Sequence, residues 1–178
     1  MTLHGPVLTT ERFELWKPAA GDLDDLVRLL EGEGMTRFLG PARATAQAQF
    51  ERLLRNAGSW ALYGYGIFYV RCRGEREIIG SSGVFHSWRG FGKGMDDTPE
   101  AGWIVRRDWW GKGVAGEVMR SALPWFDETH GRHRIACMIE AGNTASERLA
   151  AALGFVQYDS HEAEDGERTV INLFERMA

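Results

Sequence analysis

Cysteine is scarce in this sequence, and long apolar runs are absent. Its 178 residues include two cysteines, Cys72 and Cys137, which are far apart and each within an expected strand. Two isolated thiols of this kind favour a reduced, cytoplasmic protein with buried cysteines over a disulfide scaffold. No apolar run approaches the roughly 18 residues that a membrane helix needs. Residues 1–8 lack the basic start and apolar stretch of a signal peptide, so we expect neither export nor membrane association.

An excess of positive charge is also missing. The 21 lysines and arginines are outnumbered by 25 aspartates and glutamates, which gives a formal net charge of -4. This balance argues against nucleic-acid binding as the main activity. His130 and His133 are three residues apart, without a cysteine or carboxylate arrangement that favours zinc, so no metal site is predicted.

Repeats, low-complexity segments and linkers are absent too, and we expect one domain over residues 1–178. The apolar pattern predicts strands at 12–16, 66–72, 77–85, 100–105, 134–140, 155–159 and 168–174. Helices are expected after Asp22, after Thr45 (Phe50, Leu53 and Leu54 on one face, Gly58 at the end), from Val114 to about Phe126, and after a capping box at Thr144–Glu147. This order predicts an α+β fold with a mixed, mostly antiparallel sheet of about seven strands and helices on both faces.

A glycine-rich segment, 109–116, follows an expected strand and opens an expected helix. Glycine allows positive φ and a close approach of the backbone to a ligand. The first turn of a helix offers unpaired N–H groups at the positive end of the helix dipole, which favours phosphate. Arg106, Arg107 and Lys112 add positive charge there. The alternative is a tight turn without a ligand.

Two known phosphate motifs compete for this segment. A Walker-type loop is excluded, because Arg106 stands where its glycine is needed and Gly113 where its hydroxyl is needed. The dinucleotide fingerprint G-x-G-x-x-G is present as Gly111, Gly113 and Gly116, and Glu140 ends the next strand. That fold, however, begins with its fingerprint and continues in parallel βαβ units, whereas a hairpin is expected before this loop. A dinucleotide-binding enzyme is therefore the lesser alternative.

The run from Glu100 to Glu117 resembles the cofactor-binding segment of the GNAT acetyltransferases. The run from Ile139 to Phe155 resembles that family's next strand and helix, and Leu8–Trp16 is similar to the first strand of its Rim-type group, which includes ribosomal-protein N-terminal acetyltransferases. The resemblance implies the three-layer acyl-CoA N-acyltransferase fold. It also implies transfer of acetyl from acetyl-CoA to a primary amine, on a small molecule or a protein N-terminus. The oligomeric state is not predicted by the sequence, and a homodimer is suggested only by analogy with the family.

The resemblance also implies where the cofactor lies. Trp110, Gly113 and Ala115 occupy the positions where the family has Arg or Gln, Gly, and Gly or Ala. The tryptophan leaves only a side-chain contact in doubt, because backbone N–H groups hold the pyrophosphate. The pantetheine arm is expected to lie where the 100–105 strand diverges from its neighbour. Asn143 is expected either to form a hydrogen bond with this arm or only to cap a helix. The residues assigned to acetyl-CoA are Trp103, Ile104, Val105, Arg106, Gly111, Lys112, Gly113, Val114, Ala115, Gly116 and Asn143.

The chemistry needs a base, because an alkylammonium has a pKa of about 10. Glu100 matches the glutamate that starts the family's cofactor strand; otherwise it is an exposed strand-end carboxylate. A backbone N–H near Ile104 is expected to stabilise the developing oxyanion. The tyrosine that many relatives use to protonate the leaving thiolate is replaced by alanines at 150–152, so Ser146, which matches the Rim-type donor, is the candidate acid or otherwise a helix cap. Tyr158 is a poorer candidate.

Two segments bear on the acceptor, which the sequence does not identify. The glycine-rich stretch His86–Thr98 either borders the acceptor pocket or is a mobile loop. The acidic segment 162–167 either favours a cationic acceptor or is a solvated turn. A non-catalytic acyl-CoA-binding module on the same fold is the other alternative, favoured by the missing tyrosine.

Overall fold

The computed structural model describes residues 5–39, 41–163 and 169–178. Its centre is a sheet with the strand order β1-β2-β3-β4-β5-β6-β8-β7. The strands are β1 (Leu8–Thr9), β2 (Phe13–Trp16), β3 (Ile67–Cys72), β4 (Ile78–Ser87), β5 (Thr98–Val105), β6 (Ile135–Glu140), β7 (Val156–Glu162) and β8 (Val170–Arg176). All neighbouring pairs among them are antiparallel except β5 and β6. The predicted mixed sheet is confirmed, with the two-residue β1 as an additional strand.

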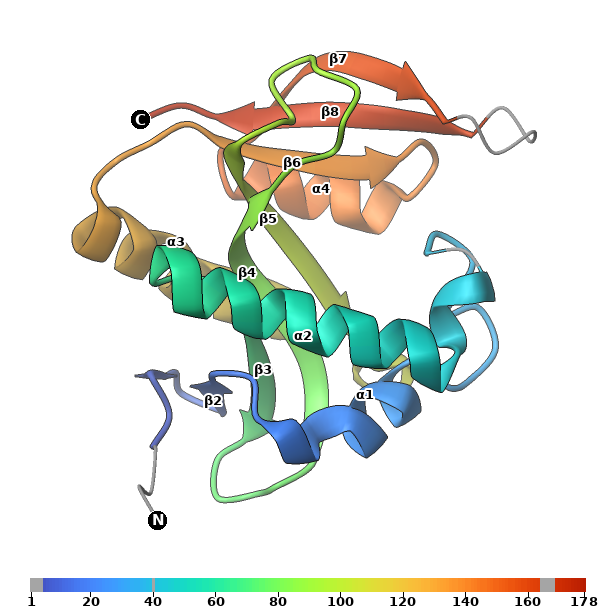
Figure 1. Cartoon of the computed structure of the whole chain (residues 1–178), viewed down its shortest axis with the longest axis vertical. Helices are drawn as coiled ribbons and strands as arrows, with labels where there is room; N and C mark the ends of the chain where they lie inside the picture. Colours follow the sequence, from blue (N-terminus) through green and yellow to red (C-terminus); the bar gives the residue numbers. More distant parts are fainter. Residues whose placement is uncertain (1–4, 40, 164–168) are drawn as a thin grey trace.

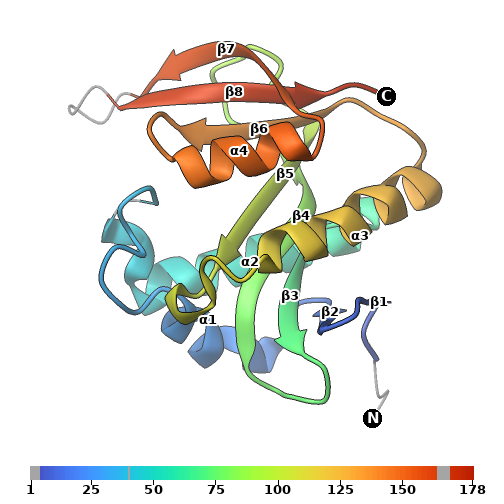
Figure 2. The same cartoon turned by 180° about the vertical axis from the view of Figure 1, so that it is seen from behind.

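The helices lie on both faces of this sheet, as predicted. They are α1 (Leu23–Leu29), α2 (Ala46–Tyr63), α3 (Val114–His130) and α4 (Thr144–Ala152), with 3-10 turns η1 (Ala20–Asp22), η2 (Pro41–Ala44) and η3 (Arg107–Trp109). Helices α1 and α2 cover one face (Figure 1), and α3 and α4 cover the other (Figure 2). Because β5 and β6 are the parallel pair in the described sheet, successive parallel βαβ units are missing from it, and the dinucleotide-binding alternative is wrong.

Successive side chains along β3 point to opposite faces of the sheet, so the strand contributes to the core on both faces. Ile67 and Tyr69 pack with α1 and α2, whereas Phe68 and Val70 pack with α3. The apolar stripe predicted for α3 is buried, with Phe126 fully enclosed. Each such large side chain contributes about 1.5–3 kcal/mol on burial, so the sheet and its helices form a rigid support for the site.

Helix α2 departs from its predicted pattern. It continues through Gly58 and ends at Gly64, whose φ of 78° is left-handed. Phe50 and Leu54 are exposed, because polar residues occupy buried positions on the inner face. Asn56, for example, donates to the hydroxyl of Tyr69 at 3.3 Å, which compensates its burial. Of the three residues predicted on one face, Leu53 is buried in the core, whereas Phe50 and Leu54 are not.

Three other expectations have a structural outcome. Both cysteines are free, but Cys72 is half-buried and only Cys137 is buried. None of the helices in the described part of the chain is long and apolar enough to cross a membrane. Residues 164–167, the larger part of the acidic segment 162–167, lie outside the described residues.

Candidate active site

Strands β5 and β6 diverge at the centre of the molecule, as the sequence predicts. Their parallel pairing is limited to Glu100 with Ala136 and Ala101 with Cys137. On its other side β5 stays paired with β4 as far as Val105. From Gly102 onward, one edge of β5 is thus open, and its backbone groups are available to an extended ligand, apart from the carbonyl of Val105, which accepts the indole N–H of Trp110.

A cavity of about 540 Å³ lies along this open edge. Nine of the eleven predicted acetyl-CoA residues line it, together with Ser146: Trp103, Ile104, Val105, Gly111, Gly113, Val114, Ala115, Gly116 and Asn143. The other lining residues were not predicted from the sequence. They are chiefly Gly34, Met35, Phe38 and Leu39 from the segment after α1, and Ala145 and Leu149 from α4. No local signal marked the segment after α1, which reaches the site only through the fold.

The glycine turn at the end of this cavity has an open backbone. Gly111 and Gly113 have φ of 72° and 74°, in the left-handed region. A Cβ at Gly111 would meet nothing within 4 Å, and one at Gly113 only Nη2 of Arg12 at 3.8 Å. The first bond of α3 runs from the N–H of Glu117 to the carbonyl of Gly113, so the preceding N–H groups lack helical acceptors. The turn fits a diphosphate in space and in polarity.

The charges around the turn differ from the prediction. Arg106 forms ion pairs with Glu77 and Asp108, each at 2.7 Å, and does not line the cavity, so it adds no free charge there. Lys112 also lies outside the lining, with Nζ 5.0 Å from the ring centroid of Trp109. Arg120 lines the cavity instead, with its guanidinium 3.0 Å from the Cβ that Gly116 lacks. Arg120 was not predicted, although it lies four residues after Gly116, one helical turn away, and this spacing places both residues on the same face of α3.

Asn143 caps α4 and also faces the cavity. Its Oδ1 accepts from the N–H of Ser146 at 3.3 Å, so the N-cap is Asn143 and not Thr144 as predicted. The indole N–H of Trp103 donates to Oγ of Ser146 at 3.3 Å. Because that oxygen accepts the indole N–H, the hydroxyl hydrogen of Ser146 remains available to a third group.

Trp110 stands where the family has Arg or Gln. Its indole N–H donates to the carbonyl of Val105 at 2.7 Å, and the guanidinium of Arg107 lies 5.6 Å from its ring centroid. Trp110 thus fastens the glycine turn to the end of β5, a structural task that needs no phosphate contact.

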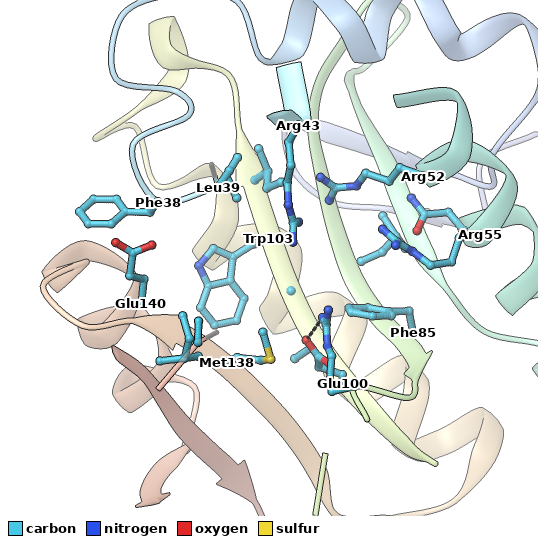
Figure 3. Close-up of a pocket in the computed structure, with 18 of the residues that line it drawn as sticks. Phe38, Leu39, Arg43, Arg52, Arg55, Phe85, Glu100, Trp103, Met138 and Glu140 are labelled. Carbon is cyan, nitrogen blue, oxygen red and sulfur yellow. Dashed lines mark hydrogen bonds and ion pairs between the residues drawn. The ribbon is translucent and has the colours of Figure 1, made fainter. Parts of the chain in front are cut away.

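A second cavity of about 600 Å³ adjoins the first. The two share Phe38, Leu39, Trp103 and Ile104 as lining residues, so they meet at the open part of β5. Figure 3 shows this second cavity with Trp103 beside it and Glu100 in its wall. The arrangement is a long, largely apolar cavity and a polar one that meet at a strand edge.

Glu100 is enclosed in the second cavity and is not the exposed strand-end carboxylate of the alternative interpretation. It is 3% exposed and accepts two hydrogen bonds from Arg89, at 2.8 Å from Nε and 2.5 Å from Nη2. Burial lowers the pKa of Arg89, but the hydrogen bonds and charge of Glu100 outweigh it, so the net pKa is raised. Each carboxylate oxygen of Glu100 keeps a second lone pair beyond its bond to Arg89, which can accept a hydrogen bond from a group in the cavity.

The stretch between β4 and β5 is anchored, and it brings Arg89 to the site. Lys93 reaches Ser160 of β7 with Nζ 2.6 Å from the carbonyl oxygen, and Met95 is fully buried. The hydroxyl of Tyr158 donates to the carbonyl of Lys93 at 2.7 Å, so it serves this contact. This stretch therefore borders the second cavity through Arg89.

Comparison with known proteins agrees with this geometry. The sequence model of the GNAT acetyltransferase domain matches residues 12–156. A Bordetella pertussis protein assigned to that family is 32% identical with a TM-score of 0.80, over 95% of this chain and 98% of its own. The uncharacterized N-acetyltransferase p20 of Bacillus licheniformis is 26% identical over 149 residues, 83% of this chain and 81% of its own. RimL, a ribosomal L7/L12 alpha-N-protein acetyltransferase solved with coenzyme A, shares the fold at 16% identity and a TM-score of 0.71, over 97% of this chain and 96% of its own. The family match spans most of the chain, and this protein belongs to the GNAT acetyltransferases.

Proposed function

We propose that this protein transfers acetyl from acetyl-CoA to a primary amine, with acetyl-CoA in the first cavity and the amine in the second. The observation that carries the proposal is the junction of the two cavities at the open edge of β5. The N–H groups at the start of α3, which lack helical acceptors, lie along the first cavity. A thioester at that junction faces both cavities.

The first cavity supplies each part of acetyl-CoA with a matching wall. The N–H groups from Gly111 to Gly116 suit the diphosphate, and Arg120 adds a positive charge beside them. The open edge from Trp103 to Val105 suits the amides of the pantetheine arm. Asn143 uses its Oδ1 for the helix cap, which leaves its amide N–H groups for the ligand.

The residues at the junction have separate tasks in this proposal. The bound thioester supplies an activated acetyl group. Glu100 takes the proton of the attacking amine, directly or through water, and a backbone N–H near Ile104 faces the negative charge that develops on oxygen. Ser146 donates its hydroxyl hydrogen to the leaving sulfur, with Trp103 as the positioning residue that fixes its oxygen. Glu140, a second carboxylate in the lining, is the competing candidate base.

Thiol release from acetyl-CoA, measured with a panel of primary amines, tests this function. We expect amine-dependent release and an acetylated product detected by mass. Coenzyme A binding without acetylation of any amine would contradict the enzyme assignment and favour the non-catalytic acyl-CoA-binding module. The melting temperature of this protein should also be higher with coenzyme A than without it, because a ligand that binds the folded state stabilises it.

A further inference from the structure

The second cavity is strongly basic although the whole chain is acidic. Its described lining includes five arginines, Arg37, Arg43, Arg52, Arg55 and Arg89, and two glutamates, Glu100 and Glu140, which gives a net charge of +3. The chain as a whole carries -4. A local reversal of sign in a concave site concentrates ligands of the opposite charge.

Four of these arginines lack acidic partners among the described residues: Arg37, and the three that the argument uses, Arg43, Arg52 and Arg55. Arg89 is neutralised by Glu100, whereas no salt bridge within 5–39, 41–163 and 169–178 involves Arg43, Arg52 or Arg55. Figure 3 shows these three side chains on one side of the cavity, with Glu140 on the opposite side. Arg52 and Arg55 lie on α2, three residues apart, and Arg43 lies on η2.

The arrangement is unfavourable without a counter-charge. Burial lowers the pKa of Arg52 to about 10, and repulsion from Arg43 contributes to that shift. Burial and the charge of Arg89 likewise lower the pKa of Arg43 and of Arg55. Arg43 and Arg55 are nevertheless exposed and Arg52 is half-buried, so water screens part of this repulsion. Three unpaired guanidinium groups on one side of a concave site are suited to a ligand that supplies negative charge.

We propose that the acceptor amine carries an oxyanion, a phosphate or a carboxylate, which binds to Arg43, Arg52 and Arg55 while its amine points toward Glu100. This inference rests on the proposed function, since it names the class of its acceptor. Guanidinium groups suit oxyanions because their planar N–H pairs match two oxygens at once. The same field repels acceptors with several positive charges, such as polyamines.

Matched acceptors that differ only in the anionic group provide the test. One pair is 2-aminoethyl phosphate and 2-aminoethanol, and the other is 3-aminopropanoate and 3-amino-1-propanol. With saturating acetyl-CoA, we expect kcat/KM for at least one anionic member to exceed that of its neutral partner by about tenfold or more, the effect of one charged hydrogen bond. The two pairs also distinguish phosphate from carboxylate as the preferred group.

Two variants assign the preference to the cluster. Arg52→Gln and Arg43→Gln are expected to lower the ratio of anionic to neutral kcat/KM by about tenfold. Arg76→Gln removes the same charge from an exposed position outside both cavities, and the ratio should stay at the wild-type value. Thermal melting confirms that each variant is folded.

The outcomes separate the two claims. Acetylation of neutral amines as fast as their anionic partners, or a preference that survives both cavity variants, overturns this inference and leaves the acetyltransferase function standing. Failure to acetylate any amine overturns the function and the inference together. An anionic preference lost only in the cavity variants supports both.

Discussion

Gly113→Glu is expected to abolish tight binding of coenzyme A. Gly113 lies at the start of α3 with a φ of 74° and lines the first cavity. A carboxylate introduced about 5 Å from one phosphate charge is repelled by about 3 kcal/mol at an effective dielectric constant of 20. That energy corresponds to a rise in Kd of about 100-fold or more, which calorimetric titration with coenzyme A measures.

The backbone itself requires a control, because any side chain at a left-handed position costs about 1–2 kcal/mol. Gly74 is matched to Gly113: its φ is 77°, and a Cβ there would meet nothing within 4 Å. It lies between β3 and β4 and lines neither cavity. Gly74→Glu should lose similar stability and bind coenzyme A normally. If Gly113→Glu binds within about threefold of the wild type, the turn does not hold the diphosphate.

Three further predictions concern single side chains. Ser146→Ala should lower kcat by about tenfold or more while the Kd for coenzyme A stays constant, because a thiolate is a modest base that still needs a donor; an unchanged kcat removes Ser146 from the mechanism. Glu100→Gln should lower kcat by about 100-fold, whereas Glu140→Gln should leave kcat within about threefold of the wild type; the reverse pattern would make Glu140 the base. Glu117 accepts from Nε of Arg12 at 2.7 Å, and although burial raises its pKa, this and its other hydrogen bonds lower it overall. The stabilisation of the fold by Glu117 is thus present above the unfolded-state pKa of about 4.5 and is lost as the pH falls through the folded-state pKa. Glu117→Gln should therefore lower the free energy of unfolding by about 1–2 kcal/mol at pH 7 and by less in acid. A loss of stability that does not change with pH would refute this.

Local patterns were enough to predict most of the sheet and the glycine turn. Val118 and Phe126 follow the period of a helix, and the glycines that begin α3 require a conformation that few other residues adopt. The insertion of β8 between β6 and β7 was not predicted, because strand order depends on pairing between distant segments. The inner face of α2 was predicted only in part: Leu53 is buried as expected, but the burial of Asn56 was missed because it gains its partner, Tyr69, only in the folded chain.

The site divides in the same way. The first cavity is built largely from one continuous stretch, 103–116, so a sequence resemblance predicted most of its lining. The second cavity is assembled from many separate parts of the chain between Arg37 and Ile171, and its arginines look like ordinary surface residues in the sequence. Arg89 illustrates the difficulty, since only the folding of the 88–97 stretch against β7 brings it to Glu100. The charge of that cavity arises when distant segments come together in the fold, so no local sequence motif could predict it.

The central claim is that backbone amides at the start of α3 hold the diphosphate of coenzyme A. A crystal structure of the protein with coenzyme A tests it most directly. We predict diphosphate oxygens within hydrogen-bond distance of the N–H groups between Gly111 and Gly116, and the pantetheine arm beside Trp103 to Val105. Coenzyme A bound anywhere else on the molecule, with those N–H groups facing water, would contradict the account.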